Sequence, residues 1–177
     1  EIGGKVNWRE KPDGSQSPYE LNITYFSALA ETDDDSEELH VRKFLASQAI
    51  MLSLRGIPGV YFHSLIGSEN DLDGVLETGE NRSINRQKFS SSQLREQLAG
   101  NNSKQRLIFD GYQKLLSLRC RQKAFHPEAA QTMLSISDSR LVAFERTSCD
   151  GEQKVIVLAN FSNQQIVLPL PSAHSER

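Results

Sequence analysis

The chain has 177 residues, with 20 Lys and Arg against 23 Asp and Glu, so its formal net charge is −3. This length fits one ordinary domain, or one domain with a small appendage. The near-neutral charge and the scattered basic residues argue against nucleic acid as a partner. The chain has no apolar run of the roughly 18–20 residues needed to cross a membrane. The hydrophobic content of 37% is slightly low for a self-contained domain. We therefore expect residues outside this sequence to complete part of the hydrophobic core.

The first ten residues lack the basic and then apolar layout of a signal peptide, and the sequence begins without Met. We therefore expect a part of a longer protein. The two cysteines, Cys120 and Cys149, and the four histidines are dispersed along the chain. This spacing predicts neither a disulfide framework nor a metal site, and it is typical of a protein in the reducing cytoplasm.

The first third of the chain predicts one long helix after an irregular start. Residues 1–18 are rich in Gly, Pro, Ser and Lys without periodicity, which predicts a loop, and residues 19–30 fit a short helix or an extended segment. Asp35, followed three residues later by Glu38, has the spacing of a helix N-cap. A mostly buried helix is expected to follow over about 36–54.

The middle of the chain predicts a strand, a long loop and two helices. The apolar run at 56–67 is typical of a parallel strand that is covered on both faces. Residues 68–90 are polar and predict a loop, and loops of that length are usually functional. Ser-capped helices are expected over 91–98, with a capping box of Ser90 and Gln93, and over about 104–122.

The last fifty residues change in character, with the boundary near 125–130. Short β-branched and apolar runs alternate with Ser-, Asp-, Asn- and Gly-containing turns, which predicts a small antiparallel sheet that packs against the preceding helices. The expected strands are 132–137, 140–146, 154–161 and 165–170.

Residues 69–80 contain an acidic pattern that nearly fits a calcium-binding EF-hand loop. Glu69, Asp71 and Asp73 alternate, Gly74 follows, and Glu80 ends the pattern, which departs from the EF-hand consensus at its first position. The expected flanking helices are missing. A calcium-binding or interaction module without catalysis therefore remains the alternative to an enzyme.

Three further groups of polar residues are candidates for function. Arg82, within residues 79–86, offers the rigid fork of donors that suits carboxylates, phosphates or sugar hydroxyls, but it could equally brace the loop against neighbouring acids. Tyr19, Glu20 and Asn22 place three polar side chains beside each other. His63, on an apolar segment, is expected to be a satisfied histidine of the core or its rim.

Four segments of the chain form a set with a characteristic order and spacing: YELNITYFSAL at 19–29, GIPGVYF at 56–62, GSEND at 67–71 and NRSINR at 81–86. In this order and spacing they resemble sucrose phosphorylase and its relatives, the phosphorylase branch of the alpha-amylase superfamily. The resemblance extends over about residues 18–125.

The resemblance implies an α/β fold built from the last β/α units of a (β/α)8 barrel, followed by a small antiparallel β domain. Residues 1–127 would be the C-terminal part of the catalytic barrel and residues 128–177 the all-β domain. Within the barrel, 36–67 would supply the seventh helix and the eighth strand, and 104–122 the last helix. The loop 68–103 would then lie on the active-site face, at the C-terminal ends of the strands.

The resemblance also implies a retaining alpha-glucoside phosphorylase, which transfers a glucosyl group from sucrose or a related glucoside to inorganic phosphate and releases glucose 1-phosphate without a cofactor. Such enzymes use an Asp nucleophile, a Glu acid/base and a third carboxylate. The motifs that carry these three groups are absent from this chain. We therefore expect no catalytic residue here and an inactive chain until a missing N-terminal barrel portion joins it.

Three residues carry over from the family as substrate-binding positions. Arg82 matches an arginine that lines the glucose subsite and pairs with an acid elsewhere on the barrel, and Tyr19 matches a tyrosine implicated in handling phosphate. Glu20 stands where sucrose phosphorylases usually have Gln, near the acceptor sugar. This departure argues against sucrose and favours a glucosylglycerol or glucosylglycerate type of substrate. The carboxylate should disfavour an anionic acceptor unless a basic residue lies between them.

Overall fold

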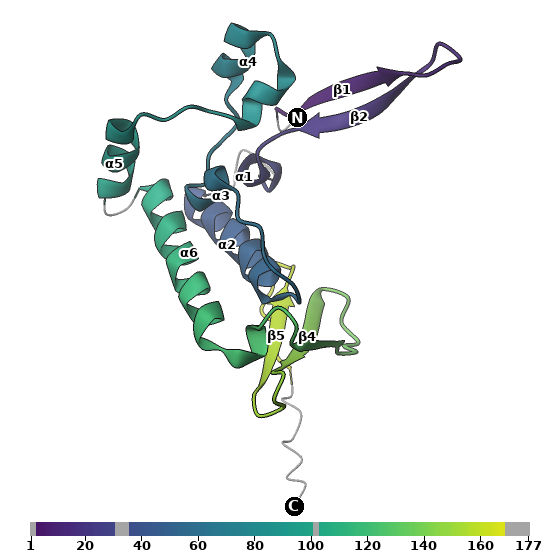
Figure 1. Cartoon of the computed structure of the whole chain (residues 1–177), viewed down its shortest axis with the longest axis vertical. Coiled ribbons are helices and arrows are strands. Elements are labelled where there is room, and N and C mark those ends of the chain that lie inside the picture. The colour runs from purple at the N-terminus through teal and green to yellow at the C-terminus, as the bar shows by residue number, and fades with distance from the viewer. Residues whose placement is uncertain (1–2, 31–35, 101–102, 169–177) are drawn as a thin grey trace, which may run out of the picture.

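The computed structural model describes residues 3–30, 36–100 and 103–168. Two long helices lie side by side at its centre, a two-stranded hairpin extends from one end, and a three-stranded sheet lies at the other end (Figure 1). The structure is therefore a mixed α/β assembly of helices with two small antiparallel sheets. In the described part of the chain, no helix combines the length and the apolar character that a membrane crossing requires.

The central helices are α2 (Glu37–Ser53) and α6 (Lys104–Arg121), which confirms both predicted helices to within a residue at each end. Ser36 and Ser103 cap them, each accepting a hydrogen bond from the backbone three residues later. The predicted N-cap at Asp35 is therefore wrong by one residue, and Asp35 itself lies outside the described residues. Serine is a good cap here because its short hydroxyl reaches back to the first turn.

The core forms where α2, α6 and the short helix α1 (Tyr25–Ala28) meet. Its aromatic rings pack edge to face, with Phe44 between Phe26 and Tyr112 at centroid distances of 5.3 and 6.2 Å. Tyr112 also donates a hydrogen bond of 2.5 Å to the buried amide of Gln48. The buried members are Phe26, Val41, Phe44, Leu52, Ile108 and Tyr112.

The predicted strand at 56–67 is not a strand in this structure. Residues 57–61 have no regular structure, and Phe62–Leu65 form the single turn α3 after an extended Tyr61. A strand exists only when a neighbour accepts and donates its ladder hydrogen bonds, and both sheets of the described residues lie elsewhere. The apolar run is accordingly open to solvent at Ile57 (87% exposed) and Tyr61 (54% exposed).

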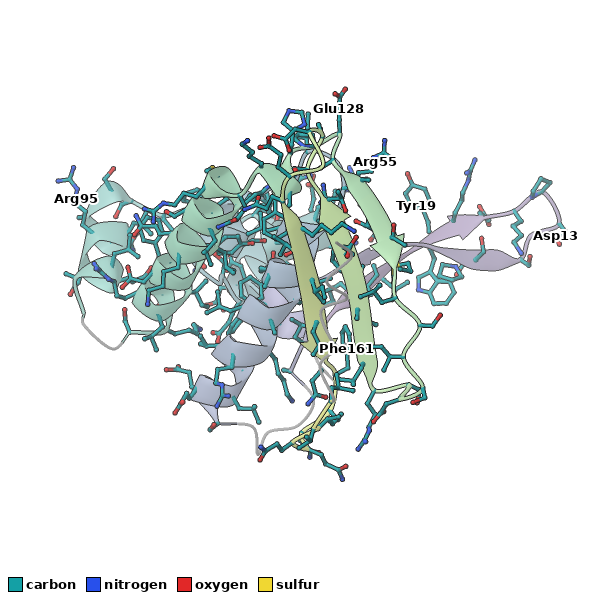
Figure 2. The ribbon with its side chains drawn as sticks, turned by 90° about the horizontal axis from the view of Figure 1, so that it is seen from below. Asp13, Tyr19, Arg55, Arg95, Glu128 and Phe161 are labelled. Atoms are coloured by element: carbon teal, nitrogen blue, oxygen red, sulfur yellow. The ribbon has the colours of Figure 1, made fainter. Side chains whose placement is uncertain are left out.

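The loop predicted for residues 1–18 is instead most of a β-hairpin. β1 (Lys5–Glu10) pairs antiparallel with β2 (Gln16–Asn22). The turn that joins them contains Asp13 and Gly14, and Gly14 has a φ of +79°, which suits glycine because it has no Cβ. Asp13 lies at the tip that projects away from the helices (Figure 2).

The polar segment 68–90 is also more ordered than a loop. It contains the helix α4 (Leu72–Thr78) and the 3-10 helix η1 (Asn81–Asn85), so the predicted loop is wrong over these residues. The next helix, α5 (Ser91–Ala99), begins with the predicted capping box of Ser90 and Gln93. Short polar helices of this kind lack the apolar periodicity that a sequence pattern would reveal.

The predicted antiparallel sheet is confirmed, with two of its four strands close to their expected bounds and the strand expected at 132–137 lying instead at 130–133. After the short 3-10 helix η2 (Lys123–Phe125), the strands β3 (Ala130–Met133), β4 (Leu141–Thr147) and β5 (Lys154–Asn160) pair in that order. The predicted fourth strand is absent over 165–168, and its remaining residues lie outside the described part. A domain boundary at 127/128 stays a prediction.

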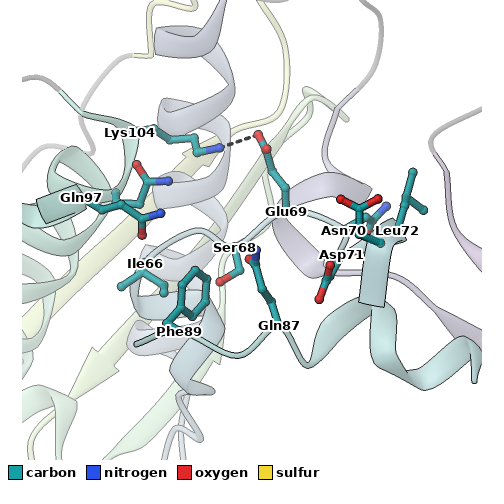
Figure 3. A pocket seen from close by; sticks show the side chains of 12 residues that line it. Ile66, Ser68, Glu69, Asn70, Asp71, Leu72, Gln87, Phe89, Gln97 and Lys104 are labelled. Carbon is teal, nitrogen blue, oxygen red and sulfur yellow. Dashed lines mark hydrogen bonds and ion pairs between the residues drawn. The ribbon is translucent and has the colours of Figure 1, made fainter. Parts of the chain in front are cut away.

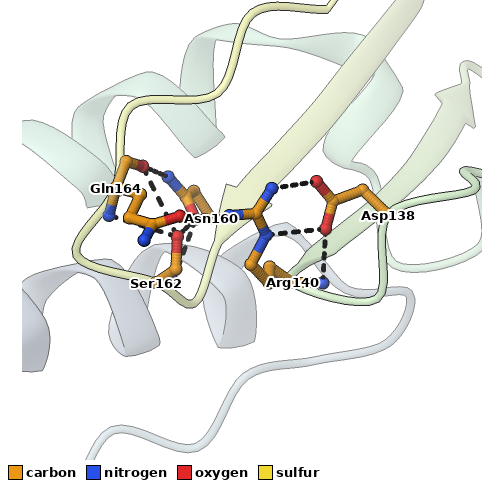
Figure 4. Close-up of polar contacts among 5 residues, drawn as sticks. All are labelled: Asp138, Arg140, Asn160, Ser162 and Gln164. Carbon is orange, nitrogen blue, oxygen red and sulfur yellow. Dashed lines mark hydrogen bonds and ion pairs between the residues drawn. The ribbon is translucent and has the colours of Figure 1, made fainter.

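One end of this sheet is closed by a group of polar contacts (Figure 4). Arg140 binds both carboxylate oxygens of Asp138, at 2.9 and 2.6 Å, and its Nη1 reaches Gln164 at 2.5 Å. Asn160 donates to the Gln164 carbonyl oxygen at 2.8 Å. The ion pair lowers the pKa of Asp138 to about 2, because the guanidinium favours the charged carboxylate.

Candidate functional site

The hairpin and η1 meet through an ion pair between two of the residues singled out in the sequence. Arg82, on η1, directs its Nε to Oε2 of Glu20, on β2, at 3.0 Å. The two side chains are 48% and 33% exposed, so the pair lies open to solvent. Arg82 thus has an acid partner within this chain, whereas the family resemblance implied an acid elsewhere on a barrel.

Asn7, on β1, extends this ion pair into a chain of hydrogen bonds. Its Nδ2 donates to Oε2 of Glu20 at 3.0 Å, and its Oδ1 accepts from Nδ2 of Asn81 at 2.6 Å. The described contacts therefore run from Asn81 through Asn7 to Glu20 and on to Arg82. We call these four residues the hairpin–η1 cluster.

The turn between α4 and η1 orients η1 so that Arg82 reaches Glu20 on the hairpin. Gly79 ends α4 in the left-handed region with a φ of +70°, which glycine adopts at no steric cost. The hydroxyl groups of Thr78 and Ser83 then bond at 2.6 Å, and Ile84 is fully buried. An anchored Ile84 fixes η1, while the neighbouring Arg82 remains at the surface.

The segment at 56–61 supports η1 from another direction. The hydroxyl of Tyr61 donates to the backbone carbonyl of Asn85 at 3.1 Å. Asp71, which caps α4 by accepting from Gly74 at 3.0 Å, also donates its backbone N–H to the carbonyl of Ile84 at 2.8 Å. Two separate parts of the chain therefore hold η1 in place.

The charges of the cluster shift each other's protonation. The hydrogen bond from Arg82 lowers the pKa of the Glu20 carboxyl, and the hydrogen bond from Asn7 adds to this effect. Glu20 in turn raises the pKa of Arg82. Both shifts favour the charged forms, the carboxylate of Glu20 and the guanidinium of Arg82.

The cluster borders an open pocket of about 410 Å³, lined by Asn7, Gly79, Glu80, Asn81 and Arg82. Within the described residues, the ion pair occupies only the Nε donor of Arg82. A guanidinium fork, a carboxylate and two amides together can bind several hydroxyl or carboxylate groups of a small polar ligand. They can hold and orient such a ligand.

The structure brings Arg82 and Glu20 together, and it leaves Tyr19 at the surface with 61% of its area exposed. The substrate-binding roles of these three residues stay predictions. Asn7 was not among the residues predicted from the sequence, because residues 1–18 were expected to form a loop. The Asp13–Gly14 dipeptide between two β-prone runs was a signal for a hairpin, and it would have placed Asn7 opposite β2.

The acidic residues at 69–80 do not form a calcium loop. Residues 72–78 are helical, Asp71 caps that helix, and Glu69 binds Nζ of Lys104 at 2.5 Å. Among the described residues, no three His, Cys, Asp or Glu side chains gather where they could hold a metal ion. The calcium-binding alternative therefore has no ligand set in this part of the chain.

A second pocket, of about 440 Å³, lies beside the Glu69–Lys104 pair between α4, α5 and α6 (Figure 3). Ser68, Gln87, Phe89 and Gln97 are among its lining residues. Ser68 bonds to Nδ1 of His63 at 3.0 Å, and the ring of His63 also contacts Phe89. These contacts agree with the prediction of a satisfied histidine at the rim of the core.

Comparison with known proteins supports the resemblance found in the sequence. No family model matches the chain. A glucosylglycerate phosphorylase of Spirochaeta thermophila is 43% identical over 97% of this chain, and one of Allomeiothermus silvanus is 47% identical over 95%. The chain spans about 30% of the length of each of these relatives.

A solved structure shows the same fold. The crystal structure of sucrose 6F-phosphate phosphorylase from Thermoanaerobacter thermosaccharolyticum matches 90% of this chain with a TM-score of 0.70 at 22% sequence identity, over 28% of its own length. The arrangement of helices and small sheets described above is therefore that of a part of this enzyme. The chain is homologous to the glucosylglycerate and sucrose phosphorylases of the alpha-amylase family, and it corresponds to about 30% of their length.

Proposed function

We propose that the chain is the C-terminal part of a retaining alpha-glucoside phosphorylase that acts on glucosylglycerate and phosphate and releases glucose 1-phosphate and glycerate. The observation that carries the proposal is the identity of 43% and 47%, over nearly the whole chain, with proteins that bear the name glucosylglycerate phosphorylase. The hairpin–η1 cluster adds a physical reason for glycerate as the acceptor.

That reason is the position of Arg82. The carboxylate of Glu20 by itself would repel the carboxylate of glycerate. Arg82 lies 3.0 Å from Glu20 and is the basic residue that an anionic acceptor requires. In our proposal the guanidinium faces the glycerate carboxylate, and Glu20 accepts hydrogen bonds from the glycerate hydroxyls. Hydrogen bonds to charged groups are about twice as strong as neutral ones.

In this proposal α2, the segment 56–61 and α6 are the last units of a (β/α)8 barrel. Residues 57–61 have no regular structure here, and a strand on each side from the rest of the barrel would turn them into the eighth strand. Active sites of such barrels lie at the C-terminal ends of the strands. The segment that follows 56–61 contains η1, so Arg82 would lie on that face.

The chemistry of glucosyl transfer would come from the rest of the barrel. Retaining transfer requires a carboxylate nucleophile and a carboxylic acid about 5 Å apart, and in the proposal both lie outside this chain. The residues described here would bind and orient the glucoside, exclude water from the acceptor position and carry no covalent intermediate.

A hybrid enzyme tests the proposal. The matching segment of the Spirochaeta thermophila glucosylglycerate phosphorylase is replaced by residues 1–177, and phosphate-dependent release of glucose 1-phosphate from glucosylglycerate is measured. We expect activity in the hybrid and none in the 177-residue chain alone. The relative with its matching segment deleted is the control.

Two results would contradict the proposal. A hybrid that is folded by circular dichroism and runs as a single species in gel filtration, yet releases no glucose 1-phosphate, would exclude this chain from the phosphorylase site. A hybrid that prefers sucrose to glucosylglycerate would retain the family but overturn the assignment of glycerate as acceptor.

A further inference from the structure

We propose that Asn7 is a positioning residue of the acceptor site, which holds the carboxylate of Glu20 in the orientation that receives the acceptor. This inference rests on the proposed function for its enzymatic consequence. Its structural part, the control of Glu20 by Asn7, can be tested without any activity.

Asn7 carries a side-chain amide that contacts both Glu20 and Asn81. Its side chain both donates to Glu20, at 3.0 Å, and accepts from Asn81, at 2.6 Å. A side-chain amide can do both at once, whereas a carboxylate can only accept and an ammonium can only donate. Asn7 therefore links the acid on the hairpin to the amide on η1.

The pairing of the hairpin strands is irregular directly after Asn7. Asn7 pairs directly with Glu20, but the next residue of β1, Trp8, pairs with Pro18. Tyr19 is thus an additional residue on β2, which makes a β-bulge. Bulges re-aim side chains and are over-represented beside active sites. Here the bulge follows the Asn7–Glu20 pair directly.

The carboxylate of Glu20 is held by two donors from different elements. Asn7 and Arg82 both bond to Oε2, each at 3.0 Å. Because Asn7 lies on β1 and Arg82 on η1, the two donors hold the Glu20 side chain between these two elements. In the proposal, the other oxygen, Oε1, accepts a hydrogen bond from an acceptor hydroxyl. A glutamate side chain loses rotamer entropy when it is ordered, and a site that is already ordered does not incur this cost on binding.

The first experiment measures the titration of Glu20 in the 177-residue chain by carboxyl ¹³C NMR. Asn7→Ala removes both contacts of Asn7. Asn7→Asp keeps the acceptor for Asn81 but places an oxygen against Glu20. We expect the pKa of Glu20 to rise in Asn7→Ala, and to rise further in Asn7→Asp because like charges then face each other.

Asn160→Ala is the matched control for this measurement. The side chain of Asn160 likewise both donates and accepts, but it lies on β5. Its Nδ2 donates to the Gln164 carbonyl at 2.8 Å, and its Oδ1 accepts from the N–H and the hydroxyl of Ser162 at 2.9 and 2.8 Å. We expect Asn160→Ala to leave the titration of Glu20 unchanged. An unchanged pKa of Glu20 in both Asn7 variants would overturn the proposal.

The second experiment measures the synthetic direction in the hybrid enzyme, with glucose 1-phosphate as donor and glycerate as acceptor. We expect Asn7→Ala to raise the KM for glycerate about tenfold, at the low end of what losing a hydrogen bond to a charged group costs, with a smaller change in kcat. A residue that only stabilised the fold would instead lower the amount of active enzyme and leave KM unchanged.

The two proposals can fail separately. If the hybrid does not use glucosylglycerate, the proposed function fails, while the Glu20 titration still decides whether Asn7 controls the carboxylate. If the titration shifts as expected but KM for glycerate stays the same in Asn7→Ala, the contact exists and its role in acceptor binding is refuted.

Discussion

Arg146, on β4, donates a hydrogen bond of 2.6 Å to the backbone carbonyl of Ser53, the last residue of α2 and 93 positions earlier in the chain. The guanidinium is fully buried, and it also donates to the carbonyl groups of His126 at 2.8 Å and Ala129 at 3.3 Å. Arg119, on α6, donates to the carbonyl of Leu52, in the last turn of α2, and to that of Gly56, which follows the helix. Two arginines therefore satisfy the helix end and join the sheet to the helix pair.

We predict that Arg146→Met lowers the free energy of unfolding of the chain by about 3 kcal/mol, because the carbonyl groups that the buried guanidinium binds then lose their donor. Urea denaturation followed by circular dichroism measures this change. Arg140→Met is the matched control. Arg140 binds Asp138 at the surface, and exposed ion pairs contribute about 1 kcal/mol or less. Equal losses in the two variants would refute the role of Arg146.

Glu20→Gln is expected to shift the acceptor preference of the hybrid enzyme from glycerate toward fructose. The change removes the carboxylate that, in the proposal, accepts hydrogen bonds from the glycerate hydroxyls, and it introduces the residue that sucrose phosphorylases usually have at this position. The ratio of kcat/KM for the two acceptors, measured with glucose 1-phosphate as donor, should change about tenfold, as expected for one charge-assisted hydrogen bond. An unchanged ratio would show that Glu20 lies outside the acceptor site.

Arg82→Ala is expected to weaken glycerate more than fructose as an acceptor of the hybrid enzyme, because in the proposal the guanidinium faces the carboxylate that only glycerate carries. Loss of one charge-assisted contact corresponds to about a ten- to hundredfold decrease in kcat/KM. Arg82→Lys should recover only part of it, since an ammonium lacks the planar fork of the guanidinium. An equal decrease for glycerate and fructose would contradict this role and would place Arg82 at the glucose that both reactions share.

The histidine at the core rim predicts a pH dependence of stability. Burial lowers the pKa of His63 below its ordinary value of 6.5, because the charged imidazolium is poorly solvated there. The unfolded chain therefore binds this proton more readily than the folded chain. Stability is complete above pH 6.5 and falls as the pH drops below it toward the folded pKa.

Urea denaturation between pH 7.5 and 5.5 measures this effect. We expect His63→Gln to reduce the slope of unfolding free energy against pH relative to the unmodified chain. The amide of Gln can still bond to Ser68, whose hydroxyl lies 3.0 Å from Nδ1 of His63. A slope that is identical in the variant would assign the pH dependence to other groups.

The local sequence determined those elements whose signals are short-range. Ser90 and Gln93 form the capping box that their spacing predicts, and Ser103 caps the helix expected after it. The alternating apolar residues at 140–146 and 154–161 became β4 and β5. Four segments, compared as a set, were enough to identify the family. Caps and periodicity depend only on neighbours along the chain, which explains these successes.

Tertiary structure alone decided the contacts that make the candidate site. The ion pair of Glu20 and Arg82 spans 62 residues, and the bond of Asn7 to Asn81 spans 74. No local pattern encodes such distances. The run at 56–67 shows that a correct local signal is also not sufficient. Its apolar, β-branched residues predict a strand, but a strand forms only where a neighbouring strand supplies the ladder hydrogen bonds. Sequence determined what each segment could become, and the partners available in three dimensions determined what it became.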